Sequence, residues 1–173
     1  QTTGQELSTQ IDALLILQQR LEQLDDFDQH RPLKFSFGLY QGNELKEKLK
    51  PVCWDQAQIT TCSHLVVVLA GIDCVKPESG EVERKFKRRE MPQEKLDMYL
   101  NLYASHLKQT LSSDENIYAW TAKQTVFAIE NMMMAAAIKG IDSCAIEGFE
   151  KEKVEEILGL DLTKYRLSVI IPF

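Results

Sequence analysis

Hydrophobic residues recur at helical intervals in three long stretches of the chain. From about residue 7 to residue 24, leucine and isoleucine alternate with polar residues at spacings of three and four, which predicts an amphipathic helix. A second helix is predicted to open at Pro92 and to place on one face Leu96, Tyr99, Leu100, Tyr103 and Leu107. The third helix is the longest and runs to Lys139.

The third helix is apolar on nearly every side. Ser112 and Glu115 have the spacing of a capping box at its start, and Gly140 takes the position just past its end. From Ile129 to Ile138 almost no polar face remains, so this part must be surrounded by protein. In a domain of this size a second subunit covers one side most easily, which predicts a homodimer.

Strand patterns lie between these helices. Residues 33–37 alternate between apolar and polar and precede a glycine, whereas residues 64–70 form a continuous apolar, β-branched run. Such a run predicts a strand that is covered on both faces. Shorter strands are predicted at residues 142–146 and 166–171. Helices and strands in this mixed order indicate an α+β fold with a central sheet under long helices.

Short helices and one long loop complete the prediction. Asn43 is positioned to cap a helix over residues 44–50, and a second short helix follows to Cys62. A third is expected at residues 151–158. The stretch 74–90 is charged and is interrupted by proline and glycine, which predicts an exposed loop.

Composition restricts the class of protein. With 173 residues and 44% hydrophobic side chains, the chain can bury one core, so a single domain over residues 1–173 is expected. A net charge of -6 argues against nucleic acid or an anionic membrane as the main partner. No apolar run is long enough to span a bilayer, no signal peptide opens the chain, and four cysteines lack metal-site spacing. These features predict a cytoplasmic protein with free thiols.

The candidate chemistry centres on the turn formed by Ala145, Ile146, Glu147 and Gly148. A glycine at a strand end lets backbone N–H groups approach a flat ligand closely. The alternative is an ordinary strand-to-helix turn, in which Glu147 lies near the N-terminal dipole of the next helix. Spacing alone leaves both interpretations open.

Several motifs resemble one known family. In the last third they are Trp120-x-x-Lys123-Gln124-Thr125, Asn131-Met132-Met133-Met134-Ala135-Ala136-Ala137 and Gly140-Ile141-Asp142-Ser143-Cys144-x-Ile146-Glu147-Gly148-Phe149. Upstream they are Leu45-Lys46-Glu47-Lys48-Leu49-Lys50-Pro51, Trp54-Asp55-Gln56-x-Gln58 and Ser63-His64-Leu65-Val66-Val67-Val68. Over roughly residues 32–173 the chain is similar to the FMN-dependent nitroreductases, in particular the bacterial oxygen-insensitive type.

This resemblance implies an α+β nitroreductase-like fold: a central mixed or antiparallel sheet flanked by helices, in an entwined homodimer. It also implies one FMN at each subunit interface, reduced by NAD(P)H and oxidised in ping-pong fashion by nitroaromatic or quinone-type acceptors. No catalytic side chain is expected, because the flavin carries the chemistry. The resemblance places around the flavin the residues Asp55, Gln58, Ala145, Ile146, Glu147 and Gly148.

Two of these positions carry finer expectations. Asp55 and Gln58 fall where the family contacts the flavin's pyrimidine edge, commonly with Asn and Lys. A glutamine in place of the lysine removes a positive charge, which should lower the flavin's reduction potential. Tyr99 and Tyr103 stand one helical turn apart and are candidates to stack on an aromatic acceptor, with packing in the helix core as the alternative.

The family's phosphate-binding motifs are not matched here. Arg31 and Lys34 are the nearest cations to the expected phosphate position, and a solvated role at a strand edge explains them equally well. Either further segments supply the phosphate contacts or this homologue has lost them. One alternative is therefore a non-catalytic homologue that binds flavin weakly or not at all and serves in storage, sensing or interaction. Another is a dimeric α+β interaction protein without a small ligand.

Overall fold

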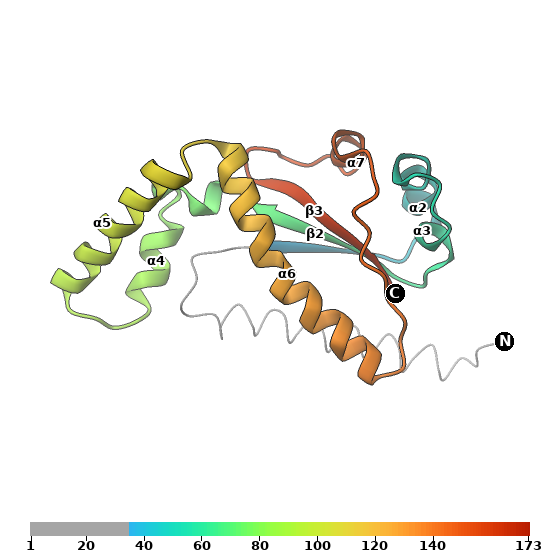
Figure 1. The fold of residues 1–173 in the computed structure, drawn as a ribbon, viewed down its shortest axis with the longest axis horizontal. Coiled ribbons are helices and arrows are strands. Elements are labelled where there is room, and N and C mark those ends of the chain that lie inside the picture. The colour runs from blue at the N-terminus through green and yellow to red at the C-terminus, as the bar shows by residue number, and fades with distance from the viewer. Residues whose placement is uncertain (1–34) are drawn as a thin grey trace.

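The computed structural model describes residues 35–173, and its centre is an antiparallel sheet. The strands pair in the order β1 (Phe35–Tyr40), β2 (Leu65–Gly71) and β3 (Tyr165–Pro172). The helix predicted for residues 7–24 and the cations Arg31 and Lys34 lie outside the described residues. Figure 1 shows the sheet in the middle of the molecule, with helices against it. A pair of helices from residues 81–110 extends past one end of the sheet.

The central strand β2 is buried along almost its whole length, as its apolar run predicted. Strand residues alternate between two faces, and each face has its own core. One face packs against the long helix α6 (Asp114–Ile138) through Val66, Val68, Val169, Ile171, Ala128, Ile129, Met132 and Ala136. The opposite face packs through Leu65, Val67, Leu167 and Ile170 against Leu49, Cys53, Ile59, Ile146 and Val154. The α+β prediction is confirmed.

The short helices belong to the second of these faces. They are α2 (Asn43–Leu49), the 3-10 turn η1 (Pro51–Cys53), α3 (Gln58–Thr61) and α7 (Lys151–Ile157). In Figure 1 they gather at one end of the sheet, while α6 crosses the sheet diagonally. The segment between α6 and α7, residues 139–150, runs beside β3.

A bulge in β3 explains how α6 is fixed to the sheet. The pairing with β2 shifts register at Ser168, which has no partner between the pairs Val68–Val169 and Leu69–Leu167. Side chains from two helices bond the backbone of the neighbouring Leu167: the Tyr118 hydroxyl donates to its carbonyl (2.7 Å), and the Glu155 carboxylate accepts from its N–H (2.8 Å). Thr125 of α6 also bonds Ser168 through their hydroxyls (2.8 Å). The bulge therefore locks α6 and α7 onto one strand.

The loop predicted for residues 74–90 was wrong. This stretch forms η2 (Asp73–Val75), η3 (Pro77–Ser79) and α4 (Glu81–Lys87), and α5 (Gln93–Thr110) follows as predicted. The prediction rested on the many charged residues of this stretch. Burial of only a few apolar side chains is enough to hold its short helices in place. Cys74, Val75 and Val82 pack inward, where the first two join a core shared with the ends of α5 and α6.

The strand predicted at residues 142–146 was also wrong. Only Ile146 pairs, in an isolated bridge with Ile170 of β3. The Cys144 N–H donates to the Pro172 carbonyl, so the segment follows the edge of the sheet without joining it as a strand. Similarly, β1 does not end at Gly38 but continues to Tyr40, whose ring covers that glycine.

Two predicted helix caps were shifted by one residue. The N-cap of α6 is Ser113, whose side chain accepts from the Asn116 N–H, and not Ser112. Asn43 is the first residue of α2 and Gly42 its cap. The positive φ of Gly140 beyond α6 agrees with the predicted helix end.

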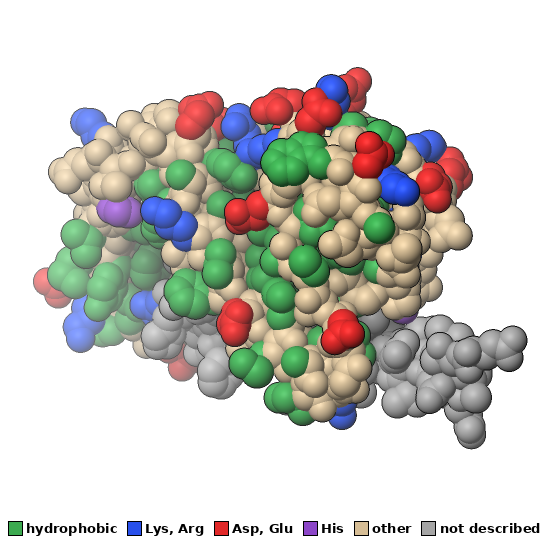
Figure 2. Space-filling view, turned by 45° about the vertical axis from the view of Figure 1, so that its right-hand side comes forward, with side chains coloured by type: hydrophobic (Ala, Val, Ile, Leu, Met, Phe, Trp, Pro, Cys, Tyr) green, Lys and Arg blue, Asp and Glu red, His purple; other side chains and the backbone are tan. Residues whose placement is uncertain are grey.

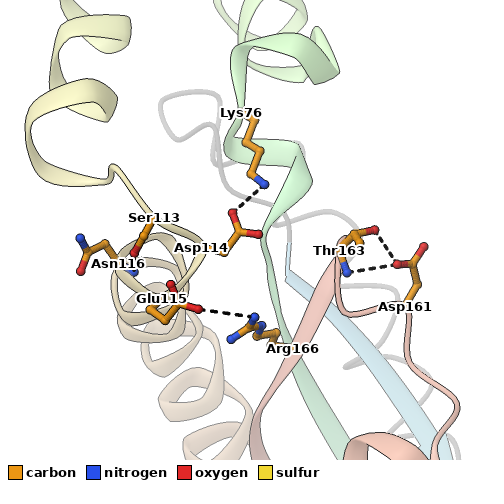
Figure 3. A network of polar contacts seen from close by, with 8 residues as sticks. All are labelled: Lys76, Ser113, Asp114, Glu115, Asn116, Asp161, Thr163 and Arg166. Carbon is orange, nitrogen blue, oxygen red and sulfur yellow. Dashed lines mark hydrogen bonds and ion pairs between the residues drawn. The ribbon is translucent and has the colours of Figure 1, made fainter.

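Polar contacts fix the start of α6 to its surroundings. Figure 3 shows the Lys76 ammonium pairing with Asp114 (2.6 Å) and Glu115 reaching toward Arg166 of β3 (3.9 Å). These pairs link the start of α6 to Lys76, which lies between η2 and η3, and to β3. Among residues 35–173, no helix combines the length and apolarity that crossing a membrane requires.

Candidate functional site

The candidate site is the 146–148 turn, which consists of Ile146, Glu147 and Gly148. All three carbonyl oxygens of this turn accept hydrogen bonds. The Ile146 carbonyl accepts from the Ile170 N–H (3.2 Å), and the Glu147 carbonyl accepts from the Phe149 N–H (3.1 Å). The Gly148 carbonyl accepts from the side-chain amide of Gln56 (2.7 Å). Every backbone acceptor of the turn therefore has a partner within the protein.

The N–H groups of the same turn are used differently. Ile146 donates to the Ile170 carbonyl (2.8 Å), but within residues 35–173 the N–H groups of Glu147 and Gly148 have no hydrogen-bond partner. In a trans peptide the C=O and N–H point in opposite directions, so the bonded Ile146 and Glu147 carbonyls fix the directions of these N–H groups. The backbone of the turn thus offers two donors and no unpaired acceptor, which suits an electron-rich edge of a ligand.

A second turn, the 54–56 turn of Trp54, Asp55 and Gln56, lies against the first. Trp54 and Asp55 both have φ of +54°, a left-handed conformation that costs a non-glycine residue about 1–2 kcal/mol. Hydrogen bonds hold it: Asp55 N–H donates to the Lys50 carbonyl, and Gln56 N–H to the Cys53 carbonyl. Strain of this kind persists where surrounding contacts fix the chain.

Gly148 is the point where the two turns meet. A Cβ added at Gly148 would lie 2.8 Å from the Trp54 ring and 3.2 Å from the Gln56 amide nitrogen. Only a residue without a side chain fits this contact. The Trp54 side chain is nevertheless 67% exposed, so the indole forms one wall beside the 146–148 turn while remaining open to solvent.

The structure brings the sequence-predicted residues only partly together. Asp55 lies on the strained turn, and Gln58 is the first residue of α3 immediately after it. Both side chains are exposed, and neither bonds the 146–148 turn within the described residues. Ala145 precedes the turn and is exposed as well. The predicted contacts of Asp55 and Gln58 with a flavin stay predictions.

Tyr99 and Tyr103 lie apart from this turn, on α5. The Tyr103 hydroxyl donates to the Val75 carbonyl (3.2 Å), and burial raises the pKa of this phenol. The Tyr99 ring stacks on Phe86 of α4, with centroids 5.8 Å apart. Tyr103 thus packs between helices, whereas Tyr99 keeps part of its ring exposed.

A cluster of charged and aromatic side chains lies where α6, α7 and β3 meet. The Lys151 ammonium lies 3.3 Å from the centroid of the Tyr118 ring, and burial lowers the pKa of this lysine. Burial, followed by the carboxylates of Glu155 and Glu147, raises the pKa of Tyr118. Glu147 is therefore electrostatically coupled to the junction of α6, α7 and β3.

Sequence reasoning missed Gln56 as a site residue. It is 92 positions away from Gly148, and no spacing rule connects the two. The only signal was local: Gln56 belongs to the motif Trp54-Asp55-Gln56-x-Gln58. Trp54 was missed for the same reason.

Comparison with known proteins agrees with the resemblance found in the sequence. The sequence model that describes the Nitroreductase family matches residues 29–173. The chain belongs to the Nitroreductase family. Among curated nitroreductases, it is 35% identical over 149 residues to a Bacillus subtilis protein provisionally named NAD(P)H nitroreductase YfkO, covering 80% of this chain and 67% of that one.

Solved structures confirm the nitroreductase fold. A Bacillus subtilis protein provisionally named nitroreductase ydfN gives a TM-score of 0.68 at 19% identity, over 80% of this chain and 65% of that one. An Exiguobacterium sibiricum protein, provisionally named a nitroreductase and solved in complex with FMN, gives 0.64 at 19% identity with the same coverage. At this identity the likeness establishes the fold alone. The chain spans about two thirds of the length of these nitroreductases.

Proposed function

We propose that the protein is an FMN-dependent NAD(P)H oxidoreductase that reduces nitroaromatic or quinone-type acceptors. The observation that carries the proposal is the 146–148 turn, whose Glu147 and Gly148 N–H groups have no partner in the described part of the chain. Membership of the Nitroreductase family and the FMN complex of the Exiguobacterium sibiricum protein support the choice of cofactor. The redox chemistry, transfer of two electrons from NAD(P)H to an acceptor, would come from FMN itself.

The residues of the turn fit a flat ring with acceptor atoms on its edge. Glu147 and Gly148 would donate hydrogen bonds to that edge, and the missing side chain of Gly148 lets the ring approach the backbone. The Trp54 indole would exclude water beside Gly148. Binding the ring in this way requires no side chain to act as an acid or a base. Asp55 and Gln58 are exposed and are given no such role.

The proposal includes a homodimer formed through α6. Several apolar side chains of this helix point away from the sheet, among them Met134 and Ile138, which is 77% exposed. Contiguous apolar surface of this kind marks interaction sites. In the space-filling view apolar side chains reach the surface through the middle of one face, while charged side chains gather along its upper edge. That distribution, in Figure 2, supports a partner subunit over the central region.

The decisive experiment is the visible absorbance spectrum of the purified full-length protein. The protein is expected to retain FMN, and anaerobic NADH or NADPH is expected to bleach the bound flavin. Flavin that binds without bleaching would favour the non-catalytic homologue instead. Protein that stays colourless after incubation with FMN would overturn the proposal and favour an interaction protein.

A further inference from the structure

The side-chain amide of Gln56 occupies an unusual place between the two turns. Its nitrogen donates to the Cys53 carbonyl (3.0 Å) on its own turn and to the Gly148 carbonyl (2.7 Å) on the other. A glutamine NH2 has two hydrogens, so both are used. Gln56 thus connects the strained 54–56 turn directly to the 146–148 turn. A main-chain bond from the Glu150 N–H to the Val52 carbonyl (2.8 Å) runs alongside.

This single contact determines the direction of two successive peptide units. Gln56 holds the Gly148 carbonyl, and because the peptide is planar and trans, the N–H of Phe149 points the opposite way, to the Glu147 carbonyl. The Glu147 carbonyl is then fixed as well. Its own peptide unit carries the Gly148 N–H, which therefore points in the direction opposite to the Glu147 carbonyl.

The two free donors are therefore held by different means. The Glu147 N–H is oriented by the backbone bridge between Ile146 and Ile170, which no side-chain substitution removes. The Gly148 N–H depends on the side chain of Gln56. Without it, the peptide between Gly148 and Phe149 loses its anchor, and a rotated carbonyl would place an acceptor beside the donors. An acceptor there repels an electron-rich ligand edge.

We propose that Gln56 is a positioning residue that holds the 146–148 turn in its donor-only orientation and thereby favours the reduced, more electron-rich form of the bound cofactor. This inference rests on the proposed function, because it assumes that FMN lies at the turn. Gln56 acts through the Gly148 peptide and is not assigned a contact with the cofactor. The strained φ of Trp54 and Asp55 places its amide where it reaches Gly148.

The test compares Gln56→Ala and the isosteric Gln56→Glu with the wild-type full-length protein. Gln56→Glu keeps the size but replaces the donor with a carboxylate that repels the Gly148 carbonyl. The midpoint potential of bound FMN gives the ratio of affinities for reduced and oxidised cofactor. Both variants are expected to lower this ratio about tenfold, which corresponds to a potential about 30 mV lower for a two-electron couple.

Amide hydrogen exchange of the cofactor-free protein is the second measurement. Loss of the Gln56 anchor is expected to speed exchange at the Phe149 amide, because its bond to the Glu147 carbonyl depends on the same peptide. Thr61→Ala is the matched control, since its hydroxyl donates to the carbonyl of Ala57, the N-cap of its own helix α3, and within residues 35–173 has no bond to the 146–148 turn.

The outcomes separate this inference from the proposed function. Wild-type protein that binds no FMN overturns the proposed function, and the inference about the cofactor with it. If FMN binds and both Gln56 variants keep the wild-type potential, the positioning role is wrong even if they unfold at a lower temperature. Unchanged exchange at Phe149 would likewise overturn it, because the peptide would then be held by other contacts.

Discussion

At the scale of single residues, Gly148 and the buried polar side chains are the positions where one change has the largest expected effect. Gly148 has no room for a side chain because the Trp54 ring lies where a Cβ would be. His64, at the start of β2, is buried with its ring nitrogens bonded to Ser63 and Gln41. Each of these contacts is local enough to test by one substitution.

Replacing Gly148 with valine is expected to weaken FMN binding about tenfold or more. The added side chain overlaps the Trp54 ring, so the two turns must move apart, at a cost of about 1–3 kcal/mol. Titration of cofactor-free protein with FMN measures the effect. Gly42→Val is the control, because a Cβ at Gly42 meets nothing within 4 Å. Equal affinities for the two variants would show that the turn is not at the cofactor.

His64 is expected to make stability depend on pH. Burial, followed by the nearby Lys46 ammonium, lowers the pKa of His64 below its ordinary value of 6.5. As the pH falls through 6.5, the unfolded chain therefore takes up a proton at His64 before the folded chain does. The free energy of unfolding should decrease as the pH falls through this range. Urea unfolding between about pH 7.5 and pH 5 measures this.

In His64→Gln that part of the acid-dependent loss should be absent. His106→Gln is the control, since His106 is exposed on α5. If the His64 variant keeps the wild-type slope of stability against pH, burial of the imidazole is not the cause of that slope.

At the scale of elements, α6 combines an exposed N-terminus with a buried stripe along the sheet. Ser113 caps the helix. The backbone N–H of Glu115, followed by the Ser113 hydroxyl, lowers the pKa of the Glu115 carboxyl. The capping serine was misplaced by one residue because Ser112 and Ser113 have the same chemistry. Burial of Ile117 one turn later sets the phase of the helix and so selects Ser113.

The two serines give a matched pair for testing this cap. Ser113→Ala should reduce the free energy of unfolding by about 1 kcal/mol, because the Asn116 N–H loses its acceptor. Ser112→Ala, on an exposed neighbour, should leave it nearly unchanged. Chemical denaturation of both variants measures the difference. A larger loss for Ser112→Ala would restore the original capping-box prediction.

At the scale of the whole molecule, residues 35–173 cover the sheet on both faces, but they leave apolar side chains exposed on the outer side of α6. The exposed side chains of Met134 and Ile138 are 55% and 77% accessible in the single chain. A helix with so little polar surface was predicted to need protein on all sides. The single chain supplies the sheet side, and the proposed second subunit would supply the other.

Introducing charge on the outer side of α6 should separate the proposed dimer. The double variant Met134→Glu and Ile138→Glu places two carboxylates in the expected interface, where burial without partners is costly. Light scattering coupled to size-exclusion chromatography measures the mass. Leu162→Glu, at an exposed leucine outside α6, should leave the dimer intact. A wild-type protein that elutes as a monomer would contradict the dimer itself.

Much of the fold could be predicted from the sequence. The buried strand β2, the helices α5 and α6 and the covered sheet followed from periodicity alone, because apolar spacing reflects which side of an element is buried. The prediction for Cys74 to Glu90 was wrong because three buried side chains among many charged ones give no periodic pattern. The strand predicted before Ile146 was wrong because a segment that pairs through a single bridge has the same apolar pattern in its sequence as a strand.

The sequence by itself determined most of the elements, the family and the glycine at position 148. Only the tertiary structure decided that Gln56 would bond the Gly148 carbonyl and that, among residues 35–173, the N–H groups of Glu147 and Gly148 would find no partner. The physical reason is that nearly every residue has the same backbone donor and acceptor. Which of these backbone groups face a ligand depends on how distant segments of the chain pack together. This packing cannot be read from the local sequence pattern.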